Sequence, residues 1–345
     1  MKVSDFDYSF PKEIIAQIPA EKRDHSRLMV LSRKTKTIEH KLFHQIIDYL
    51  NPGDLLVLND TKVIPANIVG VKEGSTVKVE ILLAKPIGRG QIWECLVKPG
   101  KRLSVGSKII FGKGEVVGKV LEKLETGEQI IEFDGELETF MKKDGKIPLP
   151  PYIISKFKTQ NSKISNELTE RYQTVYAENE GASAAPTAGL HFTKELIEKI
   201  KEKGVEVAYI TLHTGLATFK PVYVENIEDH KMYEEYFEVP IKTLEALRKA
   251  KRVVAVGTTT VRTLEGLSTN ITTNQRIVGK TDLFIYPGYK FKTVDVMITN
   301  FHFPKSTLLM LVSAFAGKEF IFDAYREAME KGYRFFSFGD AMIIL

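Results

Sequence analysis

The stretch VIPANIVGVKEGSTVKVEILLAKPIGRGQIWECLV, residues 63–97, contains three short runs in which apolar and polar side chains alternate. Three more runs of the same kind follow, KIIF at 108–111, EVVGKVLE at 115–122 and EQIIEF at 128–133. Glycine, proline and charged turn residues separate the runs, and no helical period lies between them. Six consecutive strands of this kind predict a small antiparallel barrel or sandwich.

The residues on both sides of this stretch alternate between helix and strand. The predicted elements are a helix at 41–50, a strand at 55–58, a helix capped by Thr193 and ended by Gly204, strands at 205–212, 252–256, 283–286 and 294–299, a helix capped by Thr258 or Thr259, and an apolar helix between Ser306 and Gly317. We therefore predict an α/β protein. A discontinuous α/β catalytic domain, residues 1–59 and 149–345, would surround an inserted six-stranded β-barrel-like domain at residues 60–148.

The composition is that of a globular protein. Of 345 residues, 43% are apolar and 27% are charged, which argues against disordered, collagenous and repeat-array classes. The longest apolar run, near 308–317, is too short to span a bilayer. The first residues, MKVSDFDYSFP, lack the apolar core of a signal peptide, and one cysteine, Cys95, allows no internal disulfide. We expect a cytoplasmic protein without a membrane partner, and nothing in the sequence implies a protein partner.

Positive charge is concentrated in one part of the chain. The net charge is +5, but residues 60–119 hold 11 basic and 5 acidic side chains, whereas residues 120–140 hold one basic and seven acidic ones. Such a segment permits an anionic partner. The alternative interpretation is two ordinary solvated surfaces.

Familiar nucleotide and metal motifs are missing. The segment NQRIVGKT, 274–281, ends like a phosphate-binding loop but has asparagine at the position of the first glycine. The seven histidines show neither an HExxH pair nor Cys/His ligand spacing, so we predict no metal site.

Four polar clusters each follow a predicted strand: 213–215, 257–260, 287–288 and 300–302. The carboxyl ends of strands form the ligand crevice of open α/β sheets, so these clusters are expected to converge. The connection between residues 286 and 294 is too short for a parallel crossover, and an antiparallel pair there would turn one cluster away.

His191 and Arg262 are the best single candidates by position. His191 lies two residues before the predicted cap Thr193, where the positive end of a helix disfavours protonation and suits a neutral general base. Its alternative role is packing or capping, and His213 and His302 have similar structural alternatives. Arg262 is suited to clamp a carboxylate or phosphate, unless it is an ordinary exposed helix arginine.

Several longer segments resemble one known family. They are HSRLMVL from His25, LNDTKVIPAN from Leu58, ERYQTVYA from Glu170, SAAPTAGLHFT from Ser183, TLHTGLATFKPV from Thr211, DHKMYEEYF from Asp229, VAVGTTTVRTLE from Val254, DLFIYPGY from Asp282, ITNFHFPKSTLLMLVSAFAG from Ile298 and YRFFSFGDAMII from Tyr333. In this order, and over nearly the whole chain, they resemble the S-adenosylmethionine:tRNA ribosyltransferase-isomerase family of queuosine biosynthesis.

The resemblance implies a reaction without a prosthetic group. Such enzymes transfer and isomerise the ribosyl part of S-adenosylmethionine, a consumed co-substrate, onto the 7-aminomethyl-7-deazaguanine at the tRNA wobble position. The products are epoxyqueuosine in tRNA, adenine and methionine. Because the sulfonium acidifies the neighbouring 5′-carbon, the scheme needs a base, an acid near adenine and a clamp for the methionine carboxylate.

The resemblance also implies roles for particular residues. The acid/base candidates are His191, His213, His302 and Asp295. The candidates for binding S-adenosylmethionine are Gly215, Thr258, Thr259, Thr260, Arg262, Tyr286, Pro287, Gly288 and Asn300. The candidates for binding tRNA are Arg27, Lys62, Lys98, Lys101, Arg102 and Lys220. The chain departs from the family pattern at Lys62, Asn67, Ala217, Lys220 and Tyr233. Lysine in place of arginine keeps the charge but loses the bidentate fork.

Two other functions remain open from the sequence. One is an S-adenosylmethionine-dependent RNA methyltransferase, which the missing glycine-rich loop disfavours. The other is a tRNA-binding protein without catalysis, which the strand-end polar clusters disfavour.

Overall fold

A computed structural model describes residues 1–88, 91–153, 162–215, 222–267 and 272–345. The chain forms two compact units. The α/β unit contains Met1–Lys62, Pro150–Asn179 and Ala185–Leu345, and the barrel unit contains Val63–Leu149 and Glu180–Ala184. Each unit has a hydrophobic core of its own.

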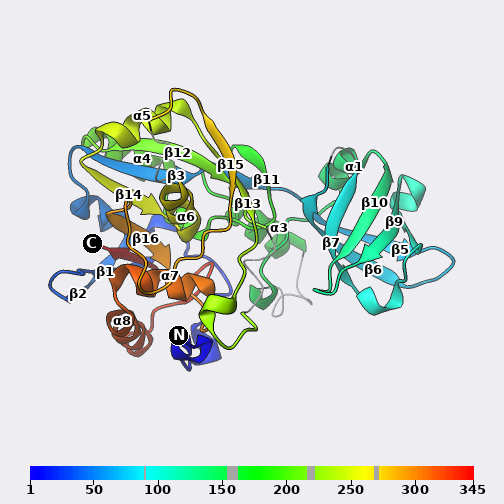
Figure 1. The fold of residues 1–345 in the computed structure, drawn as a ribbon, viewed down its shortest axis with the longest axis horizontal. Helices are drawn as coiled ribbons and strands as arrows, with labels where there is room; N and C mark the ends of the chain where they lie inside the picture. Colours follow the sequence, from blue (N-terminus) through cyan, green and yellow to red (C-terminus); the bar gives the residue numbers. More distant parts are fainter. Residues whose placement is uncertain (89–90, 154–161, 216–221, 268–271) are drawn as a thin grey trace. The chain divides into compact units, whose positions relative to one another are not determined.

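The barrel unit confirms the prediction made from the alternating runs. Its closed barrel has the order β10 (Gln129–Gly135), β7 (Ile92–Lys98), β6 (Lys78–Pro86), β5 (Asn67–Lys72), β8 (Lys108–Phe111), β9 (Val116–Lys123). All its strand pairs are antiparallel, and the alternate apolar side chains point inward. Helix α1 (Leu137–Asp144) adds Leu137, Phe140 and Met141 to this core (Figure 1).

The α/β unit is built on a nine-stranded mixed sheet. The order is β15 (Ile277–Thr281), β13 (Glu235–Val239), β12 (Glu206–Leu212), β3 (Asp54–Asn59), β14 (Arg252–Val256), β16 (Val296–Asn300), β17 (Ala341–Ile344), β1 (Arg27–Leu31), β2 (Ile38–Leu42). The four strands β12, β3, β14 and β16 are mutually parallel. A further two-stranded sheet pairs β4 (Thr61–Val63) with β11 (Asn179–Ala182).

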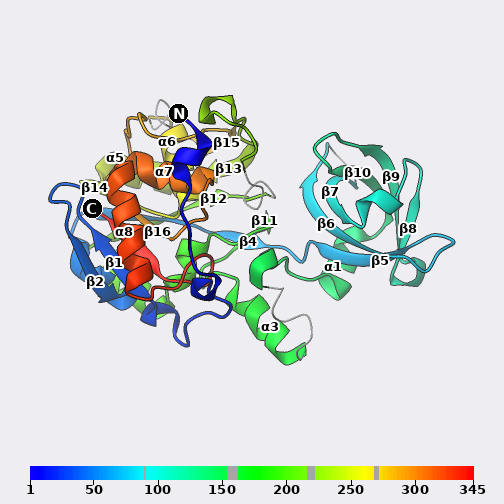
Figure 2. The same ribbon diagram turned by 90° about the horizontal axis from the view of Figure 1, so that it is seen from below.

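Both faces of the large sheet are covered, which explains why its central strands are apolar throughout. In β3, Leu55 and Val57 face one core, and Leu56 and Leu58 face the other. The first core is covered by α5 (Ile241–Lys249), α6 (Thr258–Gly266), α7 (Thr307–Ala316) and α8 (Lys318–Glu330), with α7 and α8 side by side (Figure 2). The second is covered by α4 (Lys194–Glu202) and the 3-10 helices η4 (Phe43–Tyr49) and η7 (Thr187–His191).

The remaining described elements lie in loops and at the N-terminus. They are the α-helix α3 (Ser162–Arg171) and the 3-10 helices η1 (Val3–Phe6), η2 (Lys12–Ile14), η3 (Arg23–His25), η5 (Gly100–Arg102), η6 (Gly112–Gly114) and η9 (Ile227–Asp229).

Two predicted caps are confirmed. The Thr193 hydroxyl accepts from the Leu196 amide at 3.1 Å at the start of α4, and the Ser306 hydroxyl accepts from the Leu309 amide at 3.2 Å at the start of α7. The helix α7 ends at Gly317, whose φ of 96° suits glycine.

Three sequence predictions are wrong. Residues 41–50 form the end of β2 and the 3-10 helix η4 rather than an amphipathic α-helix, because the chain must turn directly from an edge strand. Residues 283–286 are not a strand; the strand is β15, which pairs antiparallel with β13. The N-cap of α6 is Gly257, with φ of 88°, rather than a threonine.

None of the helices among the described residues has the length and apolar character needed to span a bilayer.

Candidate active site at the carboxyl edge of the sheet

The carboxyl ends of β12, β3, β14 and β16 lie at one edge of the sheet, because these strands are parallel. Asn59, at the end of β3, links its neighbours: its amide nitrogen donates to the Leu212 carbonyl at 3.0 Å and to the Thr259 hydroxyl at 3.3 Å. Three of the predicted clusters, at 213–215, 257–260 and 300–302, follow these strands. The structure therefore brings them to one edge, as expected for a ligand crevice.

His213 is a half-buried candidate histidine with one ring nitrogen left open. Its Nδ1 lies 2.8 Å from the Thr61 hydroxyl, and its ring stacks on Tyr236 with centroids 5.8 Å apart. No described residue is hydrogen-bonded to its Nε2. Burial lowers the pKa of His213 below its usual 6.5, against the opposing effect of Glu238, so the ring is neutral at pH 7.

Asp60 is a buried carboxyl group that precedes Thr61, the hydrogen-bond partner of His213. Thr211, two residues before His213 on β12, donates its hydroxyl proton to Asp60 Oδ1 at 2.6 Å. Asn179 donates in turn to the Thr211 hydroxyl at 3.0 Å. Burial raises the pKa of Asp60 above its ordinary value, although its hydrogen bonds oppose the rise. A carboxyl with a raised pKa can hold a proton that it later donates.

His191 lies at the end of η7, buried under the carboxyl end of β16. Its Nδ1 is 2.7 Å from the Ser26 hydroxyl, and its Nε2 is 3.1 Å from the Asn300 amide nitrogen, which also donates to the Phe336 carbonyl. Because Asn300 donates to Nε2, the proton of the neutral ring is on Nδ1. Both ring nitrogens are therefore engaged within the protein.

The pKa of His191 is lowered to about 3, which agrees with the prediction from the sequence that its protonation is disfavoured. The cause differs from the predicted helix dipole. Burial is the largest contribution, followed by the positive charges of Arg334 and Arg23. His191 is neutral at physiological pH, but with Nε2 occupied it is poorly placed to accept a proton from a substrate.

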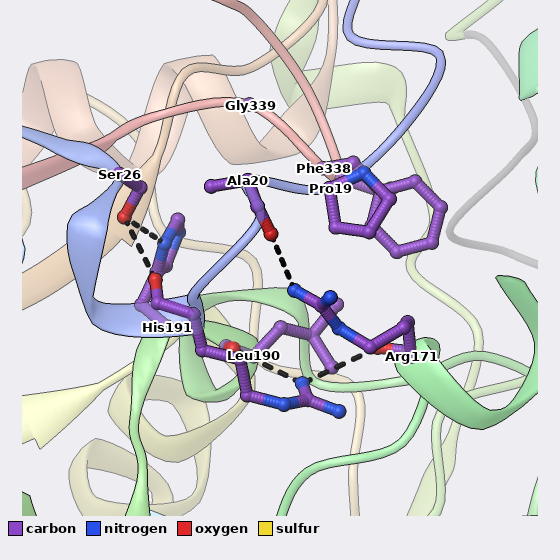
Figure 3. A pocket seen from close by; sticks show the side chains of 10 residues that line it. Pro19, Ala20, Ser26, Arg171, Leu190, His191, Phe338 and Gly339 are labelled. Carbon is purple, nitrogen blue, oxygen red and sulfur yellow. Dashed lines mark hydrogen bonds between the residues drawn. The ribbon is translucent and has the colours of Figure 1, made fainter. Parts of the chain in front are cut away.

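A pocket opens beside His191 (Figure 3). Figure 3 shows Ser26 and His191 on one side and Arg171 with Phe338 on the other. Its lining is Pro19, Ala20, Arg23, Ser26, Arg171, Leu190, His191, Ser337, Phe338 and Gly339, all within the α/β unit. The pocket is positively charged, because two of its side chains are arginines and none is acidic.

His302 and Asp295 are not brought to the same place as His191. The ring of His302 is buried, with Nε2 2.8 Å from the Thr299 hydroxyl, and burial lowers its pKa to about 3. Asp295 precedes β16, at the opposite end of the strand from Asn300, and accepts from the Val253 amide at 2.8 Å. Asp295, which the resemblance implied as a partner of the histidines or an alternate acid/base group, therefore lies a whole strand away from Asn300 and His191 and does not partner His191.

Arg262 is not an open clamp. Its guanidinium forms a buried ion pair with Glu235, and its Nε donates to the Leu283 carbonyl at 3.0 Å. Thr260 is also used internally, since its hydroxyl donates to the Val256 carbonyl at 2.6 Å. Thr258, in the first turn of α6, and Thr259, which accepts from Asn59, remain at the sheet edge.

The remaining residues predicted to bind S-adenosylmethionine lie in two loops. Gly215 follows β12 at the sheet edge, next to Thr214, whose buried hydroxyl has no hydrogen-bond partner among the described residues. Tyr286, Pro287 and Gly288 form a turn in which the Tyr289 amide donates to the Tyr286 carbonyl at 3.1 Å. This turn does not follow a strand. It was grouped with the other three clusters only because residues 283–286 were predicted to be a strand, so it is not expected to lie at the same sheet edge.

The predicted tRNA-binding residues divide between the units. Lys98, Lys101 and Arg102 are exposed around η5 in the barrel unit, where Lys72 and Lys123 also reach carbonyls of residues 100–103. In the α/β unit, Lys62 is half-buried, and Arg27 donates to the Lys331 carbonyl at 2.6 Å and covers the Tyr333 ring. Lys220 and Ala217 lie outside the described residues.

Sequence reasoning missed Asp60, Arg23 and Arg171. Asp60 had a usable signal, since it follows a buried strand as the chosen clusters do. Arg171 lies in the segment ERYQTVYA that resembles the family, but no local pattern links it to Arg23, because the two segments are far apart in the chain. Within the described ranges no group of three histidine, cysteine or acidic side chains is arranged to hold a metal ion.

Comparisons with known proteins agree over the full length of the chain. The sequence model of the queuosine biosynthesis protein family matches residues 3–344. Proteins named S-adenosylmethionine:tRNA ribosyltransferase-isomerase from Thermotoga maritima and Halothermothrix orenii are 53% and 52% identical, each over 100% of both chains. The crystal structure of S-adenosylmethionine tRNA ribosyltransferase from Thermotoga maritima matches with a TM-score of 0.56 and 44% identity, over 99% of this chain and 100% of that one.

Proposed function

The chain belongs to the queuosine biosynthesis protein family, and from that premise we propose that it is an S-adenosylmethionine:tRNA ribosyltransferase-isomerase. It transfers and isomerises the ribosyl part of S-adenosylmethionine onto the 7-aminomethyl-7-deazaguanine of tRNA, and releases adenine and methionine. The observation that carries this conclusion is the 53% identity over the whole length of an enzyme of that name. The resemblance noted in the sequence is thereby confirmed.

The chemistry is assigned to the carboxyl edge of the α/β sheet, with His213 as the general base. The sulfonium makes the 5′-hydrogens of the donor acidic, so the base must be neutral and have a free lone pair. His213 is neutral and half-buried, and no described residue engages its Nε2. His302 is also neutral, and no described residue engages its Nδ1, but its ring is buried. Thr61 fixes the other nitrogen of His213 and thereby the direction of the ring.

Asp60 is assigned as the acid that assists departure of adenine. Loss of the base from the sugar breaks a C–N bond and leaves negative charge on the purine, which a proton donor neutralises. The raised pKa of Asp60 supports this role. The tRNA amine then forms a C–N bond to the sugar and loses a proton. A sugar oxygen forms the C–O bond of the epoxide at the carbon that carried sulfur as the C–S bond breaks, so methionine leaves with that electron pair.

The anticodon loop is assigned to basic surface that includes Lys98, Lys101 and Arg102. Recognition of a single wobble base needs an unpaired loop, whose phosphates favour such a surface. We place the reaction in the cytoplasm, where tRNA and the donor meet.

The test is product identification. The purified chain is incubated with the donor and with tRNA that carries the 7-aminomethyl-7-deazaguanine, and small products and nucleoside masses are followed. We expect adenine and methionine in equal amounts and a nucleoside with the added, rearranged pentose, only when the modified tRNA is present. S-adenosylhomocysteine as the product would identify a methyltransferase instead.

A further inference from the structure

Arg23 and Arg171 form a pair of guanidinium groups with no described carboxylate within ion-pair distance, although Glu167 acts electrostatically on Arg171. Arg23 Nη1 donates to the carbonyls of Arg171 at 3.3 Å and Leu190 at 3.1 Å. Arg171 donates to the carbonyls of Ala20 at 2.6 Å and Glu21 at 3.2 Å. No described carboxylate forms an ion pair with either arginine.

Donors of both arginines remain unused. Arg171 Nε is buried without a hydrogen-bond partner, and no described residue accepts from Nε or Nη2 of Arg23. Two like charges held this close repel each other: burial, and next the charge of Arg171, lower the pKa of Arg23 to about 10. Half-buried, unpaired guanidinium groups are costly unless an anion shares their donors.

The rest of the pocket also suits an anion. Ser26 and the neutral His191 add polar atoms, and no side chain in the lining is acidic. The turn at 334–340 forms one wall and is held in an unusual conformation: Phe336 has a φ of 71°, and Gly339 packs so closely on the backbone of residues 334–335 that a Cβ would overlap it. Backbone held in such sparsely populated conformations clusters at ligand sites.

From this geometry we infer that the pocket between Arg23, Arg171 and His191 binds an oxyanion of a substrate, a carboxylate or a phosphate. The planar forks of two arginines match either group, since both offer paired oxygens at the spacing of guanidinium donors. The inference rests on the proposed function, which supplies two sources: the methionine carboxylate of the donor, and a phosphate of the tRNA backbone.

The experiment uses the unaltered protein, so folding of a variant is not a concern. Phenylglyoxal modifies arginines, and peptide mass spectrometry reports the rate at Arg23 and Arg171, with the exposed Arg248 as internal control. Arg248 likewise donates to backbone carbonyls but lies outside the pocket. The modification rates are measured for the protein without ligand, and then with S-adenosylmethionine, with its decarboxylated analogue, with tRNA and with inorganic phosphate.

We expect a bound substrate to slow the modification of Arg23 and Arg171 and to leave the modification of Arg248 unchanged. Protection by the donor but not by its decarboxylated analogue assigns the pocket to the carboxylate. Protection by tRNA and phosphate, with the donor ineffective, assigns it to a backbone phosphate. If neither substrate nor phosphate slows modification of the two arginines, the inference is overturned, whether or not the protein transfers ribosyl groups.

A kinetic measurement adds a second readout. Arg171→Lys keeps the charge but loses the fork, and should raise the KM of one substrate by roughly tenfold to a hundredfold with kcat little changed. Arg248→Lys is the matched control. Unchanged KM values for both substrates in Arg171→Lys would contradict the pocket's role, and failure to transfer in the unaltered protein would contradict the proposed function separately.

Discussion

At the scale of single residues, His191 and His213, both acid/base candidates from the sequence, differ in what their rings can do. His191 has both nitrogens engaged by Ser26 and Asn300, whereas His213 has only Nδ1 engaged. Neither the residue type nor the position in the sequence, before a helix cap for His191 and after a strand for His213, reveals this difference. It depends on which partner the fold brings to the second nitrogen.

Replacement of His213 tests its role as base. We expect His213→Gln to lower kcat by about 10²-fold or more with little change in KM, because general-base catalysis contributes on that order. The matched control is His40→Gln, on the far edge strand β2, which should keep normal turnover. Equal turnover of His213→Gln and the unaltered enzyme would remove His213 from the mechanism.

The pH profile gives a second test of the same residue. Since burial lowers the pKa of His213 below 6.5, the base is already deprotonated at neutral pH. The acid limb of kcat/KM should therefore fall below pH 6.5 and disappear in the residual activity of His213→Gln. A limb that persists unchanged in the variant would assign it to another group.

The lowered pKa values of His191 and His302 predict that the fold becomes less stable in acid. Their folded-state pKa values of about 3 lie below the unfolded value of 6.5, so the unfolded chain binds more protons between these limits. Stability should decrease as the pH falls from 6.5 towards 3, by up to about 1.4 kcal/mol per pH unit for each histidine. Urea unfolding at pH 7 and pH 5 measures this slope. His302→Gln should reduce it, and an unaltered slope would contradict the burial argument.

At the scale of elements, η7 positions His191 through a close approach to another segment. A Cβ at Gly189 would overlap the hydroxyl of Tyr176, which is buried and ends a rigid ring. Ala188 lies next to Gly257, where an added Cβ would be in ordinary contact with Ala188 Cβ at 3.8 Å. The small residues of SAAPTAG thus allow η7 to lie across the ends of β14 and β16.

Gly189→Ala tests this packing. We expect it to destabilise the fold by about 1–3 kcal/mol, the usual cost of overpacking, as measured by urea unfolding. Gly266→Ala is the control, because its Cβ would meet Thr281 only at an ordinary 3.4 Å. Equal stability of the two variants would mean that η7 moves freely and does not fix His191.

Sequence patterns predicted elements best where one strong periodicity decides them. The six barrel strands and both caps at Thr193 and Ser306 were predicted because alternation and capping are local properties. The segment 283–286 was mistaken for a strand because it is apolar, although its side chains pack on the core from a loop. Arg262 was misjudged because its partner Glu235 lies 27 residues away, and no local signal identifies such a pair.

At the scale of the whole molecule, the barrel unit carries a concentration of positive charge that the sequence already showed. The exposed Lys98, Lys101 and Arg102 gather around η5, near the end of β9 where Lys123 donates to carbonyls of that turn. The opposite end of β9 carries instead the ion pair of Lys143 with Glu115. The assignment of residues 1–59 and 149–345 as the catalytic domain stays a prediction.

Neutralisation of this basic cluster tests its contact with tRNA. Changing Lys98, Lys101 and Arg102 together to glutamine should weaken tRNA binding. It should also reduce the slope of the logarithm of the association constant against the logarithm of the salt concentration by up to about 2, because each phosphate contact with a single-stranded loop contributes about 0.7. The control triple, Lys113, Lys142 and Lys143 to glutamine, makes the same charge change at the other end. Equal slopes for both variants would remove the η5 cluster from the binding surface.

The central claim is that this α/β sheet edge removes a proton from the 5′-carbon of a sulfonium donor and transfers the remaining pentose to tRNA. The most direct test uses donor with both 5′-hydrogens replaced by deuterium, with mass spectrometry of the modified nucleoside. We predict that the transferred sugar retains one deuterium at most at that carbon, and that His213→Gln forms this product far more slowly. A product that retains both deuterium atoms would contradict the account.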